Sequence, residues 1–160
     1  MKQTFVTCVD IDGNEHEVAI DTLQWRPSAY AIVIRDGHLL VSRQFNGFDL
    51  PGGGVDLGEL PDAAAIRETK EETGIDVNTP EMVGAHSNFF KLPTHNNDRF
   101  VQSILMYYRC SFVGGELSMD GFDEFEKEHG DMPEWLPLAE LDTIQLASSF
   151  DWRAFVRRAL

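Results

Sequence analysis

Residues 53–75 read GGVDLGELPDAAAIRETKEETGI, and the fold that we predict follows from this stretch. Its second half predicts a helix from Pro61 to Thr73, because proline suits the first helical position and the alanines behind it are strong helix formers. Gly74 then stands where a C-terminal cap belongs. The first half is too rich in glycine to favour a regular element. The stretch therefore predicts a loop, a helix and a second turn.

The predicted helix gathers carboxylates on one side. Glu68, Glu71 and Glu72 are spaced i, i+3 and i+4, so their side chains share a face. Three like charges there destabilise an isolated helix. Carboxylate oxygens in this arrangement suit Mg²⁺ or Mn²⁺, which keep waters that phosphate oxygens can replace. Glu59 adds a fourth carboxylate before the helix, and Arg67 can pair with a neighbouring glutamate and hold its orientation.

The glycines before the helix strengthen the metal hypothesis. A helix rich in Glu and Lys, taken alone, is more often a solvated charged face. Here Gly52, Gly53 and Gly54 let the backbone approach a ligand closely, and a glycine carbonyl can coordinate a metal. We expect the stretch Leu50–Gly54 to lack regular structure. A glycine turn that leads into a carboxylate-bearing helix suits a metal–diphosphate site.

The spacing of these residues resembles the Nudix box. Gly53, five residues, Glu59, seven residues and then Arg67 to Ile75 match each Gly, Glu and Arg that this motif fixes. Thr69 departs from the family pattern, because its slot is usually aliphatic. Leu60 also departs, because it stands where a Ser or Thr helix cap is common. Neither position is a ligand of the motif.

The resemblance covers roughly residues 28–145 and implies a fold and an activity. The fold is the Nudix α/β/α sandwich, an α/β fold with a mixed β-sheet, in which the box forms a loop–helix–loop. The activity is hydrolysis of the pyrophosphate bond of a nucleoside diphosphate linked to another moiety. The cofactor is Mg²⁺ or Mn²⁺. The implied partner is thus a small nucleotide-like diphosphate substrate.

The resemblance also implies roles for single residues. Glu68, Glu71 and Glu72 bind the metal together with Gly53, and Glu59 supports them through water or a second ion. Arg67 fixes a glutamate, and Glu71, Glu72 and Arg67 form the catalytic group.

The general base is either Glu72 itself or a glutamate of the loop before the Trp-containing strand, as in many relatives. That loop offers Glu124, Glu126 and Glu128, with His129 adjacent. We favour Glu128, against the plainer interpretation of a solvated acidic loop.

Basic and aromatic residues near the predicted pocket are candidates for substrate binding. Arg43 can clamp a phosphate from the strand before the glycine turn, and Lys91, His95 and Arg99 surround a polar loop at residues 94–98 that can close over a ligand. Each is equally compatible with an ordinary surface position. Four aromatics can stack on a base but are more often core residues at strand positions: Phe45, Phe48, Phe89 and Phe90.

Outside the box the pattern predicts a single domain over residues 1–160. Residues 1–27 form an N-terminal β-hairpin extension around an Asp10–Asn14 turn, which either adds to the sheet or provides a homodimer interface. A second hairpin joins residues 29–34 and 38–44 through Asp36-Gly37. The remaining predicted elements are strands at 82–90, 100–113 and 134–136, an acidic loop at 118–133, a short helix from Pro137, and a last helix that Ser148-Ser149 caps.

Composition limits the class of protein. Hydrophobic residues make up 42% and aromatic residues 11%, as in folded globular proteins. The formal net charge of −14 repels polyphosphate backbones, so we expect no nucleic-acid polymer as a ligand. A phosphorylated small molecule then needs a cation or a basic pocket at its site.

Cys8 and Cys110 lie far apart in apolar runs, which predicts buried structural thiols. The N-terminus lacks the apolar core of a signal peptide, and no stretch approaches the length of a membrane span. We therefore expect a cytoplasmic protein without a membrane partner.

Two other function classes stay open. A non-catalytic Nudix sensor usually has lost box glutamates or carries a DNA-binding domain, and the chain shows neither. An isoprenoid diphosphate isomerase needs an added cysteine/glutamate pair, which the two cysteines do not clearly support. For a hydrolase, ADP-ribose and nucleoside triphosphates are equally good candidates beside nucleotide sugars and dinucleoside polyphosphates, because the box contacts only the diphosphate that they share.

Overall fold

The computed structural model describes residues 4–45, 47–93 and 99–160. Its strands are β1 (Phe5–Val9), β2 (Glu15–Ala19), β3 (Gln24–Arg35), β4 (His38–Gln44), β5 (Gly47–Asp49), β6 (Gly52–Gly54), β7 (Ile75–Leu92), β8 (Arg99–Gly115) and β9 (Gly130–Pro137). Its helices are α1 (Pro61–Thr73), α2 (Glu124–His129) and α3 (Arg153–Ala159), with 3₁₀ turns η1 (Ile20–Thr22) and η2 (Leu138–Glu140).

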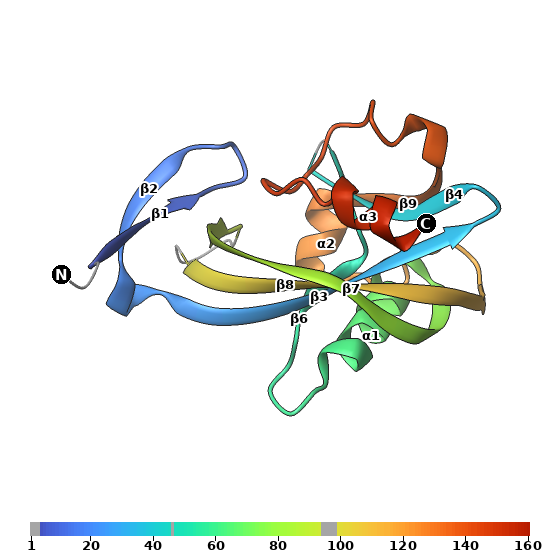
Figure 1. Cartoon of the computed structure of the whole chain (residues 1–160), viewed down its shortest axis with the longest axis horizontal. Helices are drawn as coiled ribbons and strands as arrows, with labels where there is room; N and C mark the ends of the chain where they lie inside the picture. Colours follow the sequence, from blue (N-terminus) through green and yellow to red (C-terminus); the bar gives the residue numbers. More distant parts are fainter. Residues whose placement is uncertain (1–3, 46, 94–98) are drawn as a thin grey trace.

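The strands form one mixed sheet in the order β2-β1-β7-β8-β3-β4-β5, with β6 paired to β3 and β9 paired to β4. β3 runs parallel to β8, and β1 runs parallel to β7. The other pairs are antiparallel. Figure 1 shows the long strands β3, β7 and β8 crossing the molecule together.

Helices cover the sheet on both faces. On one face α1 buries Ala64 and Ala65 against strand residues such as Val33. On the other face α3 and the segment before it bury Trp152 and Phe155 in a second core. Figure 1 shows α1 and α3 on opposite sides of the strands. The predicted α/β sandwich with a mixed sheet is confirmed.

The box helix has the predicted bounds. It begins at Pro61 without a side-chain cap from Leu60 and ends at Thr73, and the capping Gly74 has a φ of 76°, the left-handed conformation that glycine tolerates. The unusual Thr69 is fully buried, and its hydroxyl donates to the carbonyl of Ala65 at 2.7 Å. A polar residue therefore fits this apolar slot because its hydroxyl is satisfied within the helix.

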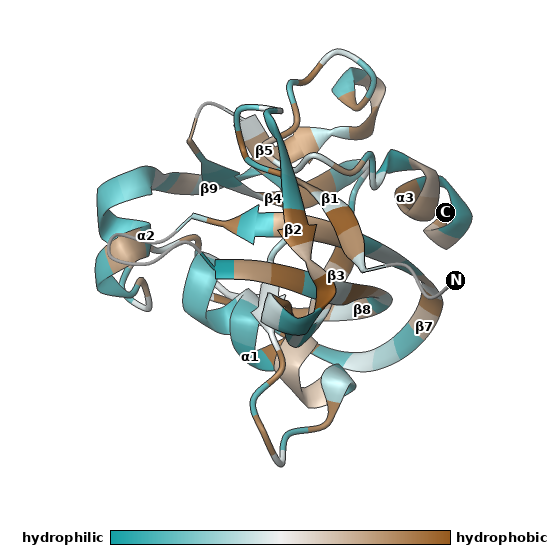
Figure 2. Cartoon of the chain, turned by 90° about the vertical axis from the view of Figure 1, so that its left-hand side faces the viewer, coloured by the Kyte–Doolittle hydropathy of each residue, from teal (hydrophilic) through white to brown (hydrophobic). Residues whose placement is uncertain are grey.

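The N-terminal hairpin adds to the sheet, which was one of its two expected roles. β1 and β2 pair from Phe5↔Ala19 to Val9↔Glu15, and Val9 pairs with Phe90 of β7. Cys8 lies in the small core of the hairpin, and Cys110 lies in the core under α1, so both cysteines are free buried thiols as predicted. Figure 2 views the chain from the hairpin side.

The glycine stretch corrects one expectation. Gly52–Gly54 is the short strand β6, antiparallel to residues 28–30 of β3. A Cβ on Gly52 would lie 2.3 Å from the carbonyl oxygen of Ala29. The glycines thus let this segment approach β3 closely enough to pair, where we expected no regular structure.

Two C-terminal expectations were also wrong. The acidic stretch contains α2, which begins with a capping box in which Asp123 accepts from the Glu126 amide and Glu126 accepts from the Asp123 amide. The last helix begins at Arg153 and not after the serines, because the Ser148 hydroxyl accepts from the Phe150 amide in a local turn instead. Among the described residues, no helix is long and apolar enough to cross a membrane.

Candidate active site

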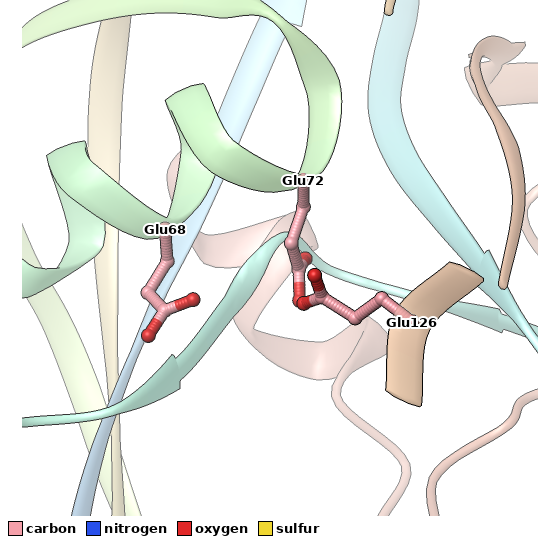
Figure 3. A group of neighbouring side chains, drawn as sticks. All are labelled: Glu68, Glu72 and Glu126. Carbon is pink, nitrogen blue, oxygen red and sulfur yellow. The ribbon is translucent and has the colours of Figure 1, made fainter. Parts of the chain in front are cut away.

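Three carboxylates converge between α1 and α2. Glu68 and Glu72 come from α1 and Glu126 from α2, and one oxygen of each lies within 4.8 Å of the others. Figure 3 shows the Glu72 and Glu126 carboxylates side by side, with Glu68 one turn earlier on α1. Two elements far apart in sequence therefore build one acidic cluster.

Glu72 is the most buried member, with 4% of its surface exposed. Its Oε2 accepts a hydrogen bond from the Gly52 amide at 3.1 Å, and its Oε1 accepts one from Gln44 at 3.4 Å. Burial raises the pKa of Glu72 well above its ordinary value, and the charges of Glu68 and Glu126 raise it further. A buried acid with two acidic neighbours is stabilised by a cation between them.

The other two members are half-buried, and burial raises the pKa of each. Gly53 lies against Glu68: a Cβ added to the glycine would stand 2.8 Å from Glu68 Oε1. Glycine thus keeps the carboxylate free of a steric neighbour. The cluster consists of hard oxygen donors with room beside them, and this donor set fits Mg²⁺ or Mn²⁺.

Arg67 holds the surrounding carboxylates in place. It binds Glu59 through two hydrogen bonds of 2.8 Å, and it donates to Glu68 at 2.9 Å and to Glu71 at 3.1 Å. The bidentate bond to Arg67 lowers the pKa of Glu59 to about 2. The predicted pairing of Arg67 with a glutamate is therefore present in the structure, and it includes Glu68 of the acidic cluster.

The structure separates the predicted ligands into two groups. Glu68 and Glu72 lie in the acidic cluster, whereas Glu59 and Glu71 lie outside it; Arg67 contacts both of these and Glu68 as well. On α2 the cluster takes Glu126, while Glu128, which we favoured from sequence, is exposed and is not a member. The sequence signal for Glu126 is the Asp123-x-x-Glu126 capping box, which fixes where α2 starts and how Glu126 is oriented.

A pocket of about 390 Å³ adjoins the cluster and receives some of the predicted binding residues. Lys91 and Arg99 line it, and His95 lies outside the described residues. Arg43 does not line it; its guanidinium faces Glu134 at 3.5 Å and lies over the ring of Phe48. Of the four aromatics, Phe45 and Phe90 line the pocket, while Phe48 and Phe89 pack against core clusters.

Arg26 is a pocket residue that we did not predict. Its guanidinium donates to the Ser28 hydroxyl at 2.6 Å and lies next to Gly54. No ion pair joins Arg26 to a carboxylate in the part of the chain that the structure describes. A half-buried cation beside the glycine strand, in a protein of net charge −14, can receive a substrate phosphate.

Asp49 is a second unpredicted pocket residue, and it gives a test of the site's electrostatics. Burial raises its pKa to about 7. Between the unfolded value near 4 and this folded value, the native protein holds a proton that the unfolded chain has lost. Stability contributed by this group is therefore fully present below about pH 4 and falls as the pH rises toward 7.

Asp49→Asn removes that pH dependence, because asparagine stays neutral. We expect the variant and the wild type to melt at similar temperatures near pH 4.5, and the variant to melt a few degrees higher near pH 8. Thermal melts across this range in metal-free buffer measure the difference. A difference that is constant with pH would show that Asp49 is ionised throughout in the native protein.

The family of the chain follows from comparison with known proteins. The model of the NUDIX domain matches residues 24–157. The chain belongs to the Nudix family. The match includes α1, the glycine strand and α2, which together carry the acidic cluster, and it begins after the N-terminal hairpin. Nudix proteins generally depend on divalent metal ions, in keeping with this cluster.

Curated Nudix relatives are similar over part of the chain. A MutT-like protein of Streptomyces ambofaciens is 44% identical over 55% of this chain and 53% of its own length. An ADP-ribose pyrophosphatase of Methanocaldococcus jannaschii is 33% identical over 63% of this chain and 59% of its own. An RNA pyrophosphohydrolase of Sphingopyxis alaskensis is 35% identical over 47% of this chain and 52% of its own. The chain thus spans about half the length of these relatives.

Solved structures share the fold. The MutT NUDIX hydrolase from Burkholderia pseudomallei has a TM-score of 0.60 and 21% identity, and the match covers 86% of this chain and 99% of that one. At this identity the likeness concerns the arrangement of the sheet and helices. It agrees with the mixed sheet between α1 and α3 described above.

Proposed function

We propose that this Nudix protein is a metal-dependent hydrolase that cuts the pyrophosphate bond of a nucleoside diphosphate linked to another moiety. The observation that carries the proposal is the convergence of Glu68, Glu72 and Glu126 within 4.8 Å, beside a glycine strand and a pocket of about 390 Å³. The cluster has the donors for a cation, and the pocket has room for a small molecule.

Each residue has a task in the reaction. Glu68 and Glu72 would hold Mg²⁺ or Mn²⁺, which when bound neutralises diphosphate charge and acidifies a water, and Glu126 lies beside them. The Gly52 amide keeps Glu72 in place, and Arg67 keeps Glu68 in place. Arg26 binds a phosphate at the glycine strand. Water oxygen bonds to one phosphorus, the bridging P–O bond breaks, and Glu126 takes the proton of the water.

The intact cluster favours catalysis over a sensor role. A protein that only bound the diphosphate would not need three buried or half-buried acids whose burial raises the pKa of each. For the substrate, relatives named ADP-ribose pyrophosphatase favour ADP-ribose as the first compound to test, followed by nucleoside triphosphates and nucleotide sugars. We further propose that the enzyme acts in the cytoplasm.

The proposal is tested with a panel of ADP-ribose, the nucleoside triphosphates and UDP-glucose. We expect phosphorus-NMR or chromatography to show two phosphate-bearing products from at least one class, in the presence of Mg²⁺ or Mn²⁺ and not of a chelator. If the protein binds the metal and hydrolyses none of these compounds, the result would favour the non-catalytic sensor class.

Metal binding itself gives a prediction that needs no substrate. Adding Mn²⁺ or Mg²⁺ is expected to raise the melting temperature by several degrees, because a cation at 100 times its dissociation constant stabilises the folded state by about 2.7 kcal/mol. Excess chelator reverses the shift. Ca²⁺ and K⁺ at matched ionic strength serve as controls for size and for general screening. Equal shifts with K⁺ would contradict a specific divalent site.

A further inference from the structure

The N-terminal hairpin contributes to the pocket although it lies outside the family domain. The NUDIX match begins at residue 24, whereas β1 and β2 span residues 5–19. Even so, Val9, Asp10 and Ile11 line the same pocket as Glu68 and Glu72. Figure 1 shows the hairpin beside the ends of β7 and β8. An element added to the family fold therefore forms one wall of the site.

This wall is preformed. The Asp10 carboxylate accepts hydrogen bonds from the amides of Asp12 and Asn14 at 3.0 and 2.8 Å, and it pairs with His16 at 2.9 Å. Because of these bonds the Asp10 carboxylate faces the loop that follows it, and the conformation of the turn is fixed. Ile11 follows with 39% of its surface exposed. The wall therefore presents aliphatic surface in a fixed position.

Phe90 and Asn88 extend the wall along β7. Val9 pairs with Phe90, and Asn88 stands two residues before it, so both β7 side chains point to the same face and both line the pocket. The Asn88 Oδ1 is buried and has no hydrogen-bond partner among the described residues. An aromatic ring thus lies next to an amide whose oxygen has no partner among the described residues, and the broad terminal torsion of asparagine lets that amide rotate toward a ligand.

Arg26 lies on the same face, nearer the acidic cluster. Asn88 pairs with Ser103 of β8, and Ser103 pairs with Arg26 of β3. Two inter-strand spacings separate Asn88 from Arg26, which is about 10 Å. Arg26 in turn lies next to Gly54, at the glycine strand beside Glu68. A line of residues thus leads from the acidic cluster through a cation to an aromatic ring.

We propose that Val9, Ile11, Asn88, Phe90 and Arg26 form a nucleoside-monophosphate subsite. The base stacks on Phe90 against the aliphatic side chains of the hairpin, its edge bonds to Asn88, and Arg26 binds the phosphate that leads to the bond being cut. The inference rests on the proposed function for its link to catalysis, because it names which residues recognise the nucleoside. The N-terminal hairpin then supplies the aliphatic wall against which the base packs.

The competing occupant of this wall is a second anion. Lys91 and Arg99 also line the pocket, and Arg99 donates two hydrogen bonds to the Gln24 side chain. We favour a base because the surface beside these cations is apolar: Val9, Ile11, Phe90, Leu92 and Pro93. A sugar phosphate or polyphosphate would leave this apolar surface uncovered, whereas a planar base covers it.

The test measures binding of AMP, GMP, CMP and UMP to the metal-free protein by calorimetry or NMR titration, with inorganic phosphate and ribose 5-phosphate as smaller probes. We expect at least one nucleotide to bind about tenfold more tightly than both smaller probes, since base–aromatic stacking has roughly this effect. Phe90→Leu is expected to remove about that factor. Ile11→Ser is expected to weaken the nucleotide several-fold without changing phosphate binding.

Two matched variants control the experiment. Ile20→Ser changes an isoleucine of 40% exposure that does not line the pocket, and it should leave the dissociation constants of all the nucleotides and smaller probes unchanged. Arg26→Gln should weaken nucleotides and inorganic phosphate alike. Nucleotides that bind no better than ribose 5-phosphate, or Ile11→Ser constants equal to those of Ile20→Ser, would overturn the subsite. Tripolyphosphate that binds more tightly than every nucleotide would assign the wall to an anion instead.

This experiment is independent of turnover. It uses neither metal nor a cleavable bond, so a failure of hydrolysis in the substrate panel leaves its result intact. Conversely, the protein could hydrolyse a substrate of the panel while the Ile11 and Phe90 substitutions leave its nucleotide dissociation constants unchanged. That result would support the proposed function and contradict the subsite.

Discussion

Replacing Glu72 with glutamine is expected to lower turnover on the order of 10³-fold while raising the melting temperature of the metal-free protein. Glu72 is 4% exposed and shares its site with Glu68 and Glu126. Weakened charge stabilisation of the diphosphate costs several kcal/mol in the transition state, and 1.36 kcal/mol is tenfold in rate. Glutamine keeps an oxygen for the Gly52 amide and removes a buried charge from between two others.

The matched control for this variant is Glu71→Gln. Glu71 belongs to the same helix and to the same sequence motif, but its side chain is 45% exposed and turns toward Arg67. We expect Glu71→Gln to retain considerably more activity than Glu72→Gln and to leave the melting temperature almost unchanged. Steady-state kinetics with saturating metal and thermal melts with chelator measure both. Equal losses in the two variants would place Glu71 among the metal ligands, as the family resemblance implies.

The sequence predicts α1 well because its signals are local. Proline at the first position, the run of alanines and Gly74 act within a few residues of one another, and the helix has the predicted bounds. The shared face of Glu68 and Glu72 follows from helical geometry alone. The contacts of Glu59 and Glu71 with Arg67 do not, because the Arg67 guanidinium is also positioned by β6, where it donates to the Gly54 carbonyl at 3.2 Å.

The pocket residues that the sequence analysis did not predict reach the site through pairing of strands that are far apart in the chain. Arg26 reaches the pocket because β3 lies between β6 and β8, and Asn88 reaches it because β7 lies across β8 from β3. No local pattern encodes these neighbours. The same holds for Arg43, whose strand was predicted correctly but whose side chain faces Glu134 outside the pocket.

Replacing Glu126 with glutamine is expected to lower kcat by roughly 10²- to 10⁴-fold, the range for loss of a general base. Glu126 is the α2 residue whose carboxylate joins Glu68 and Glu72. The Glu126 carboxylate also accepts a hydrogen bond from the Asp123 amide in the capping box of α2. The side-chain oxygen of glutamine can accept the same bond, so α2 should stay folded. We expect KM to change little and the stabilisation by Mn²⁺ to be reduced less than in Glu72→Gln.

Glu128→Gln is the control that distinguishes the two candidate general bases, Glu126 from the structure and Glu128 from the sequence analysis. Glu128 lies two residues further along the same short helix, is exposed, and stands outside the acidic cluster. Its variant should retain nearly wild-type kcat. Residues i and i+2 of a helix point in directions about 200° apart, so one of the two side chains at most can reach the diphosphate while α2 keeps its present orientation. An inactive Glu128→Gln beside an active Glu126→Gln would therefore require α2 to rotate when substrate binds.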